Sequence, residues 1–133
     1  MRVVLPGTTV LLVDDDEDFL ELFSALLSTR GARVSCATSV EEALERLRMG
    51  PHAVIVSDLE MPGPDGIALI RQVRASVDRR LAEIPAIALT ARSDPLARQL
   101  ALNAGFGRHM VKPVDVAILC AEIAMLIGPP GSN

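Results

Sequence analysis

Polar side chains follow directly after four short apolar runs of this sequence. The run Val54–Asp58 is rich in β-branched residues, ends in a carboxylate and is closed by a turn rich in proline and glycine. Such runs are typical of strands that are buried on both faces. The polar residues at the ends of the four runs are Asp14 and Asp15, Asp58, Thr90 and Lys112. If the runs are parallel strands, these groups meet at one edge of a sheet.

The charges of this set predict a divalent cation. Three carboxylates face one ammonium, and two like charges about 4 Å apart repel by about 4 kcal/mol at an effective dielectric of about 20. A cation relieves that repulsion. Oxygen ligands favour Mg²⁺ or Ca²⁺, and a site with few protein ligands, which keeps several waters, favours Mg²⁺. We therefore expect Mg²⁺ as the cofactor.

The two remaining polar groups suit a phosphoryl group. Lys112 carries a mobile point charge that can bind a phosphoryl oxygen, and the Thr90 hydroxyl can donate a hydrogen bond to another. A carboxylate beside Mg²⁺, lysine and threonine is equipped to attack phosphorus, and the product is an aspartyl-phosphate. Asp58, which stands alone at the end of its run, is the candidate nucleophile.

Strand and helix patterns alternate along the chain. Strands are expected at 9–13, 32–36, 54–58, 85–89 and 109–111, and each is followed by residues with helical spacing. Asp16, Glu17 and Asp18 are expected in the first turn of a helix, where negative charge is favoured, and Ser39 to Glu42 forms a capping-box pattern. Residues 76–84 are expected to be a mixed connection. The alternation predicts a parallel sheet with helices on both faces and all carboxyl ends at one edge.

The composition limits the classes of protein to which the chain can belong. Its 133 residues suit one domain, half of them are hydrophobic and only three are phenylalanine, so the core must be aliphatic. A net charge of −4 argues against a nucleic-acid partner. No apolar run approaches the length of a membrane span, which predicts a cytoplasmic protein without membrane contact. Cys36 and Cys120 lack the spacing of a metal or redox motif and are expected to be core residues.

Four stretches of the sequence resemble the receiver domain of two-component response regulators. They are Val13–Asp15, Ser57–Pro62 with Asp65 and Gly66, Leu89–Ala91, and Val111–Pro113. The resemblance covers residues 9–127, which leaves residues 1–8 as a lead-in and 128–133 as a disordered tail. It implies a flavodoxin-like, doubly wound (βα)5 fold, in which a five-stranded parallel sheet of order 2-1-3-4-5 lies between two helical layers.

The resemblance also implies a role for each residue of the site. Asp58 becomes the phosphoacceptor, and Asp14 and Asp15 bind the metal together with Asp58 and the backbone carbonyl of Glu60. Thr90 becomes the switch hydroxyl, with Ala91 beside it, and Lys112 the lysine that senses the phosphoryl group. Two residues depart from the family pattern: His109 stands where many receivers have Tyr or Phe, and Glu60 adds a carboxylate beside the phosphorylation site.

The function implied is that of a phosphoacceptor module rather than a turnover enzyme. It would take a phosphoryl group from a phosphohistidine of a sensor histidine kinase or phosphotransfer domain, lose it by slow autodephosphorylation or onward transfer, and signal by a change in shape. No output domain follows residue 127, so we expect action through a partner, whose identity the sequence does not indicate, or membership in a longer chain. Leu5–Asp16, Ala104–Phe106 and Lys112–Asp115 look most like receivers of hybrid histidine kinases.

Two other functions and one assembly follow from the same residues. A small Mg²⁺-dependent phosphatase would use Glu60 as a second acid two residues after Asp58, although Met61 and Pro62 do not fit that pattern. A pseudo-receiver would bind a partner without carrying phosphate, although the acid, threonine and lysine set is complete. A weak homodimer would use the face made by the helix after Asp94, the strand 109–111 and the last helix.

Overall fold

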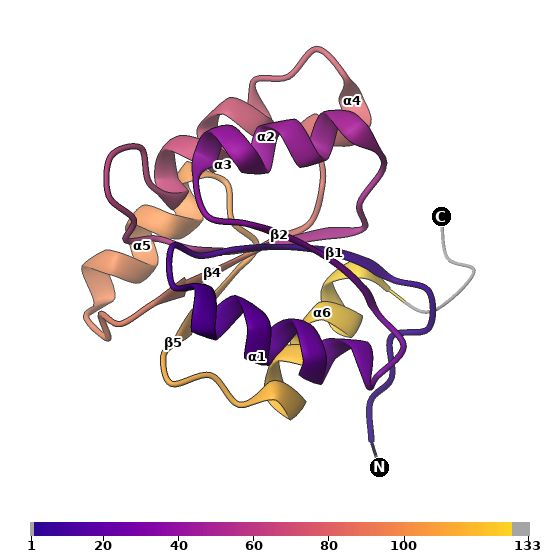
Figure 1. Ribbon diagram of the computed structural model, residues 1–133. Helices are drawn as coiled ribbons and strands as arrows, with labels where there is room; N and C mark the ends of the chain where they lie inside the picture. The colour runs from indigo at the N-terminus through magenta and orange to yellow at the C-terminus, as the bar shows by residue number, and fades with distance from the viewer. Residues whose placement is uncertain (1, 129–133) are drawn as a thin grey trace.

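Five parallel strands form the centre of the molecule, in the order β2-β1-β3-β4-β5 (Figure 1). The computed structural model describes residues 2–128. The strands are β1 (Thr9–Val13), β2 (Arg33–Ala37), β3 (Val54–Asp58), β4 (Ala86–Thr90) and β5 (Arg108–Val111). The predicted fold class and strand order are confirmed. β3 and β4, which have strands on both sides, are buried at every residue.

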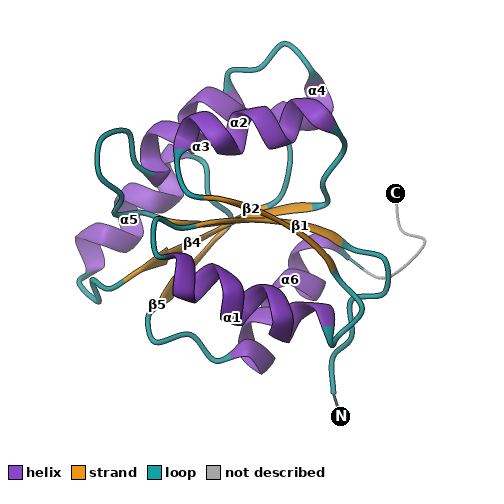
Figure 2. Ribbon diagram, in the orientation of Figure 1, coloured by secondary structure: helices purple, strands orange, loops and turns teal. Residues whose placement is uncertain are grey.

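Helices cover both faces of the sheet and create three layers (Figure 2). They are α1 (Glu17–Ser28), α2 (Val40–Met49), α3 (Gly66–Arg74), α4 (Arg79–Ala82), α5 (Pro95–Ala104) and α6 (Val116–Ile127). α1 and α6 lie on one face, and α2 and α3 lie on the other. None of the helices in residues 2–128 is long and apolar enough to cross a membrane.

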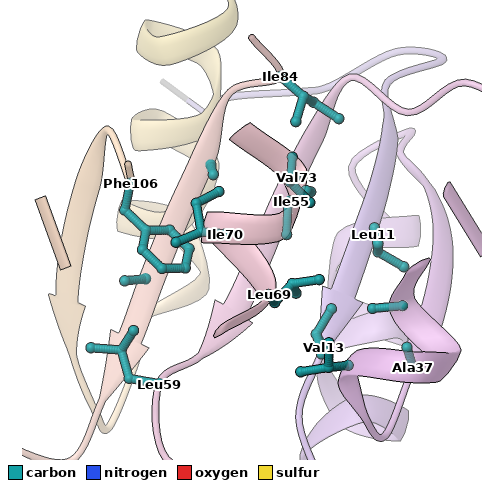
Figure 3. Close-up of a cluster of buried hydrophobic side chains, with 14 of the residues drawn as sticks. Leu11, Val13, Ala37, Ile55, Leu59, Leu69, Ile70, Val73, Ile84 and Phe106 are labelled. Carbon is teal, nitrogen blue, oxygen red and sulfur yellow. The ribbon is translucent and has the colours of Figure 1, made fainter. Parts of the chain in front are cut away.

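The two faces of the sheet bury separate aliphatic clusters. Leu11 and Val13 of β1 point to the face of α2 and α3, and Val10 and Leu12 point to the face of α1 and α6. This alternation follows from the two-residue period of a strand. Figure 3 shows the first cluster, in which residues of β1 and β3 meet α3 and Phe106. Each fully buried aliphatic side chain contributes roughly 1.5–3 kcal/mol, so both layers hold the strands in place beneath the site.

Side-chain caps fix where the helices begin. Asp16, Asp65, Asp94 and Asp115 each accept hydrogen bonds from backbone N–H groups in the first turn of α1, α3, α5 and α6. The pattern at α2 differs from the predicted capping box in one bond. Ser39 accepts from the Glu42 N–H at 3.1 Å, whereas the Glu42 carboxylate accepts from Thr38 N–H at 3.0 Å, one residue before the cap.

The predictions differ from the structure in the connection 76–84 and at strand ends. The connection contains the short helix α4, which Asp78 caps; Ile84 is buried and Leu81 packs, partly buried, against the first cluster. β2 and β4 both begin one residue later than predicted. In the lead-in, Leu5 is buried and its N–H donates to Arg30 O, so this segment packs beside α1. The predicted tail lies, apart from Gly128, outside the described residues.

Candidate functional site

The strand register brings the predicted polar groups to one edge of the sheet. Val13 pairs with Ser57, so Asp14 and Asp58 follow from neighbouring strands at nearly the same level. On the other side of β3, Asp58 pairs with Leu89, and Thr90 pairs with Val111. Lys112 comes directly after that last pair, and its N–H donates to Thr90 O at 2.8 Å. The topology therefore positions side chains that are far apart in the sequence.

Lys112 links the two buried carboxylates. Its Nζ donates to Asp14 Oδ2 at 2.7 Å and lies 3.5 Å from Asp58 Oδ2. Asp14 is almost fully buried, and its other oxygen accepts from the Asp16 N–H at 2.9 Å. Burial alone disfavours the ammonium, but the Asp14 hydrogen bond and the charges of both carboxylates raise the pKa of Lys112. The lysine thus stays charged between two acids.

The carboxyl group of Asp58 has a raised pKa. Burial disfavours its charged form, the Asp14 carboxylate repels it, and together they raise the pKa of Asp58 to about 6, against the opposing effects of Lys112 and the Glu60 N–H. That N–H donates to Asp58 Oδ1 at 3.2 Å. The ionised carboxylate is therefore an energetically costly group at neutral pH, and a nearby cation would stabilise it.

The three predicted acidic ligands are close enough to share a metal ion. Asp14, Asp15 and Asp58 each offer a carboxylate oxygen, and these oxygens lie within 4.8 Å of one another. Asp15 is exposed, so the cluster is open to solvent on one side. An all-oxygen set with excess negative charge fits a hard divalent cation. Asp16 is outside the set because its carboxylate caps α1 through the N–H groups of Asp18 and Phe19.

Thr90 and Glu60 are in direct contact. The buried Thr90 hydroxyl donates a hydrogen bond to Glu60 Oε1 and accepts one from the Arg92 N–H at 3.0 Å. Both roles of the hydroxyl are thus occupied. The sequence placed Glu60 beside Asp58, but the contact between its side chain and Thr90, thirty residues away in the sequence, was not foreseen, because it depends on the path of the loop after β3. Ala91, the next residue, is exposed.

His109 lies partly buried on β5. Among residues 2–128, its Nε2 is the one buried side-chain nitrogen or oxygen that lacks a hydrogen-bond partner. Burial, together with the charge of Arg98, lowers the pKa of His109. The ring is therefore held in its neutral form in a place where a polar nitrogen is unfavourable.

Gly66 is required by close packing under the acceptor strand. A Cβ atom at this position would lie 2.3 Å from the Asp58 carbonyl oxygen and 3.0 Å from Leu59 Cα. The first residue of α3 thus presses directly on the end of β3. The sequence indicated a turn glycine here, and the structure gives the stronger reason, which is the approach of two backbones.

Phe19 is a residue of the site that the sequence analysis did not identify. Lys112 Nζ lies 4.7 Å from the centroid of its ring, and Phe19 stacks on Phe23 at 4.4 Å. An ammonium over an aromatic face is stabilised by roughly 0.5–1 kcal/mol or more. No signal in the sequence connects residue 19 with residue 112.

These features define a receiver domain, and comparison with known proteins gives the same result. Residues 10–124 match the family model described as the response regulator receiver domain. The chain belongs to this family. By family it is a signalling module of two-component systems, which agrees with the order of its strands.

Three relatives illustrate the range of the family. The chain is 42% identical over 106 residues to the uncharacterized 14.6 kDa protein in the sodA1 3′ region of Leptolyngbya boryana, covering 80% of this chain and 79% of that one. It is 34% identical to the transcriptional regulatory protein AfsQ1 of Streptomyces coelicolor, covering 90% of this chain but 51% of the regulator. The signal receiver domain of a signal transduction histidine kinase from Syntrophus aciditrophicus superposes with a TM-score of 0.83 at 28% identity, covering 96% of each chain. The chain thus spans about half the length of the curated transcriptional regulator.

Proposed function

We propose that Asp58 accepts a phosphoryl group in a Mg²⁺-dependent reaction and that the resulting charge changes the shape of the surface near β4 and β5. The observation that carries this proposal is the convergence of Asp14, Asp15, Asp58, Thr90 and Lys112 at one edge of the sheet. Family membership supports the same assignment.

The residues have distinct tasks in the transfer. An Asp58 carboxylate oxygen forms a bond to phosphorus while the P–N bond of the donor phosphohistidine breaks, and the electron pair of that bond stays on the imidazole nitrogen. Lys112, already 3.5 Å from Asp58, binds a phosphoryl oxygen. Asp14, Asp15, Asp58 and the Glu60 carbonyl are the proposed ligands of Mg²⁺, which when bound offsets negative charge on the phosphoryl group.

The phosphoryl donor is proposed to be a sensor histidine kinase or a phosphotransfer domain. A surface suited to such a partner lies beside Lys112, where Phe19, Leu22 and Leu26 of α1 and Val114 line a shallow, mostly apolar depression. Leu22 is half exposed there. The structural likeness to a receiver domain of a histidine kinase supports a parent of the hybrid-kinase type. The downstream partner stays unassigned.

A weak homodimer through α5, β5 and α6 is a further part of the proposal. Leu96, Leu100, Val111 and Ile118 expose between 40% and 57% of their surface on these elements, which supports an association that buries them. The expected cytoplasmic location and the absence of nucleic-acid contacts stay predictions. We also propose that the module has no substrate turnover beyond slow loss of its own phosphoryl group.

Intact-mass analysis after incubation with acetyl phosphate and Mg²⁺ tests the proposal. The wild-type chain should gain one phosphoryl group, and Asp58→Asn should gain none. Asp65→Asn is a matched control, because Asp65 caps α3 and asparagine caps equally well, so its labelling should equal that of the wild type. Full labelling of Asp58→Asn would contradict the assignment, an unlabelled wild type would indicate a pseudo-receiver, and sustained hydrolysis of a generic phosphate ester would indicate a phosphatase.

A further inference from the structure

Glu60 contacts both functional residues of β3 and β4. Its N–H donates to Asp58 Oδ1 at 3.2 Å, and its carboxylate accepts the hydrogen bond of the Thr90 hydroxyl. The backbone of one residue therefore binds the proposed phosphoacceptor while its side chain binds the proposed switch. A substitution confined to the side chain removes the contact with Thr90 and leaves the backbone hydrogen bond to Asp58 in place.

The Thr90 hydroxyl has one hydrogen to donate, and Glu60 holds it. A hydroxyl carries a single O–H donor, so Thr90 cannot donate to Glu60 and to a phosphoryl oxygen at the same time. Its oxygen is also engaged, because the Arg92 N–H donates to it at 3.0 Å. Movement of the hydroxyl toward Asp58 must therefore break the bond to Glu60.

The charge of Glu60 opposes phosphorylation as well. A phosphoryl group brings about 1.5–2 negative charges, two residues along the chain from this carboxylate. Within residues 2–128, Glu60 forms no salt bridge that would neutralise it, and the nearby Arg92 is paired with Asp94 at 3.1 Å. Hydrogen bonding and charge thus act in the same direction.

We propose that Glu60 is a positioning residue that holds Thr90 in the unphosphorylated conformation and competes with the phosphoryl group for the Thr90 hydroxyl hydrogen. This inference rests on the proposed role of Asp58 as the acceptor. The phosphorylated conformation is then less populated than it would be with an apolar residue at position 60, and a binding partner that favours that conformation has to supply the difference.

The affinity for beryllofluoride in the presence of Mg²⁺, measured by ¹H–¹⁵N chemical-shift titration, tests this proposal. Beryllofluoride mimics the phosphoryl group without a chemical step. Glu60→Ala, which loses the acceptor and the charge, should bind about tenfold more tightly than wild type, and Glu60→Gln, which keeps an acceptor but no charge, about threefold more tightly. Glu45→Gln on α2 removes one exposed carboxylate elsewhere, and its affinity should match wild type.

Thr90→Val distinguishes the hydrogen bond from a general charge effect. In that background Glu60→Ala should tighten beryllofluoride binding about threefold rather than tenfold, since only the charge effect remains and there is no hydroxyl to release. An affinity of Glu60→Ala within twofold of wild type would overturn the proposal. An equal tightening with and without the Thr90 hydroxyl would overturn it too, because Glu60 would then act through its charge alone.

The unmodified protein provides a second test that does not depend on phosphorylation. If Glu60 holds Thr90, then Glu60→Ala should shift the Thr90 methyl resonance and the Arg92 amide resonance, and three-bond couplings should show averaging of the Thr90 χ1 angle. A single fixed Thr90 rotamer in both chains would overturn the contact. A wild-type chain that shows the contact but takes no phosphoryl group from acetyl phosphate would refute the role of Asp58 instead.

Discussion

The two halves of the proposed phosphorylation site differ in how far they are assembled. In the first half, Asp14 and Asp58 at the ends of β1 and β3 are already in contact with Lys112, which follows β5. In the second half, Thr90 at the end of β4 is bound to Glu60, and His109 within β5 has a buried nitrogen without a partner. The first half is assembled but carries excess negative charge, whereas Thr90 in the second half is held by a contact with Glu60 that the proposed active state must break.

This difference predicts that the two halves affect the free energy of the proposed phosphorylation in opposite directions. Relief of like-charge repulsion by a cation favours the first half in its reactive arrangement. The second half opposes phosphorylation, because the hydrogen bond from Thr90 to the charged Glu60 carboxylate must be exchanged for a hydrogen bond to the phosphoryl group. We therefore expect substitutions in the first half to affect metal binding and stability, and substitutions in the second half to affect the response to phosphorylation.

The largest predicted effect concerns the backbone that supports the first half. Gly66→Ala places a methyl group 2.3 Å from the Asp58 carbonyl oxygen, so β3 and α3 must move apart. We expect a loss of about 2–4 kcal/mol in the free energy of unfolding by urea and weaker Mg²⁺ binding. Gly50→Ala is the control, because a Cβ at Gly50 meets nothing within 4 Å and the backbone there is extended. A loss below about 0.5 kcal/mol at Gly66 would show that the two backbones can separate easily.

Asp15 and Asp16 are neighbours in the sequence but should have different effects on Mg²⁺ binding. Asp15→Asn should weaken Mg²⁺ binding by about tenfold or more, or roughly 1.4 kcal/mol, because Asp15 belongs to the acidic cluster. Asp16→Asn should change the affinity little, since Asp16 caps α1 and asparagine is an equally good cap. Isothermal titration calorimetry measures both. Equal losses in the two variants would mean that the ligand pair is Asp15 and Asp16.

A third prediction uses the raised pKa of Asp58. The folded-state pKa of about 6 exceeds the ordinary value of 3.8, so between these values the folded state binds more protons and stability decreases as the pH rises. Asp58→Asn removes the buried charge, and in the absence of Mg²⁺ it should stabilise the protein by about 1–2 kcal/mol at pH 7.5. The gain should disappear near pH 4. Urea unfolding at several pH values checks this, and a gain that does not depend on pH would point to packing instead of charge.

The first half was also the more predictable from sequence. Strand ends, β-branched runs and helix caps are local patterns, and they predicted a parallel sheet with polar groups at one edge. The resemblance to receiver domains supplied the strand order that brings Asp14, Asp58 and Lys112 together. The second half depends on long-range geometry. The hydrogen bond from Thr90 to Glu60 joins a strand end to the side chain of a loop residue, and no local sequence pattern predicts the direction of a side chain. For the same reason the ring of Phe19 beside Lys112 was not predicted in the first half. The helix α4 was missed because a single turn leaves too short a period to detect.

The smallest predicted effect concerns His109, in the second half of the site. His109→Phe replaces a buried unpaired ring nitrogen with carbon, so we expect a gain of about 1 kcal/mol or less in the free energy of unfolding at pH 7.5. Because the folded-state pKa of His109 is lowered, the unfolded state takes up more protons as the pH falls below about 6.5. The free energy of unfolding of the chain with His109 then decreases as the pH decreases, while that of the chain with phenylalanine at this position does not. The difference in the free energy of unfolding between His109→Phe and the chain that keeps His109 should therefore grow toward pH 5.5.

The unfolding comparison is made with Asp58→Asn in both chains, since Asp58 titrates in the same range with the opposite sign. In chains that keep Asp58, addition of beryllofluoride should shift the amide resonances of residues 94–104 only modestly and in a pH-dependent way when residue 109 is histidine. The shifts should be larger and independent of pH when it is phenylalanine, because an apolar ring can fill the space that Thr90 leaves without burying an unpaired nitrogen. A large, pH-independent rearrangement in the histidine form would show that His109 acts as an ordinary ring switch, and the contrast between the two halves would then rest on Glu60 and Thr90 alone.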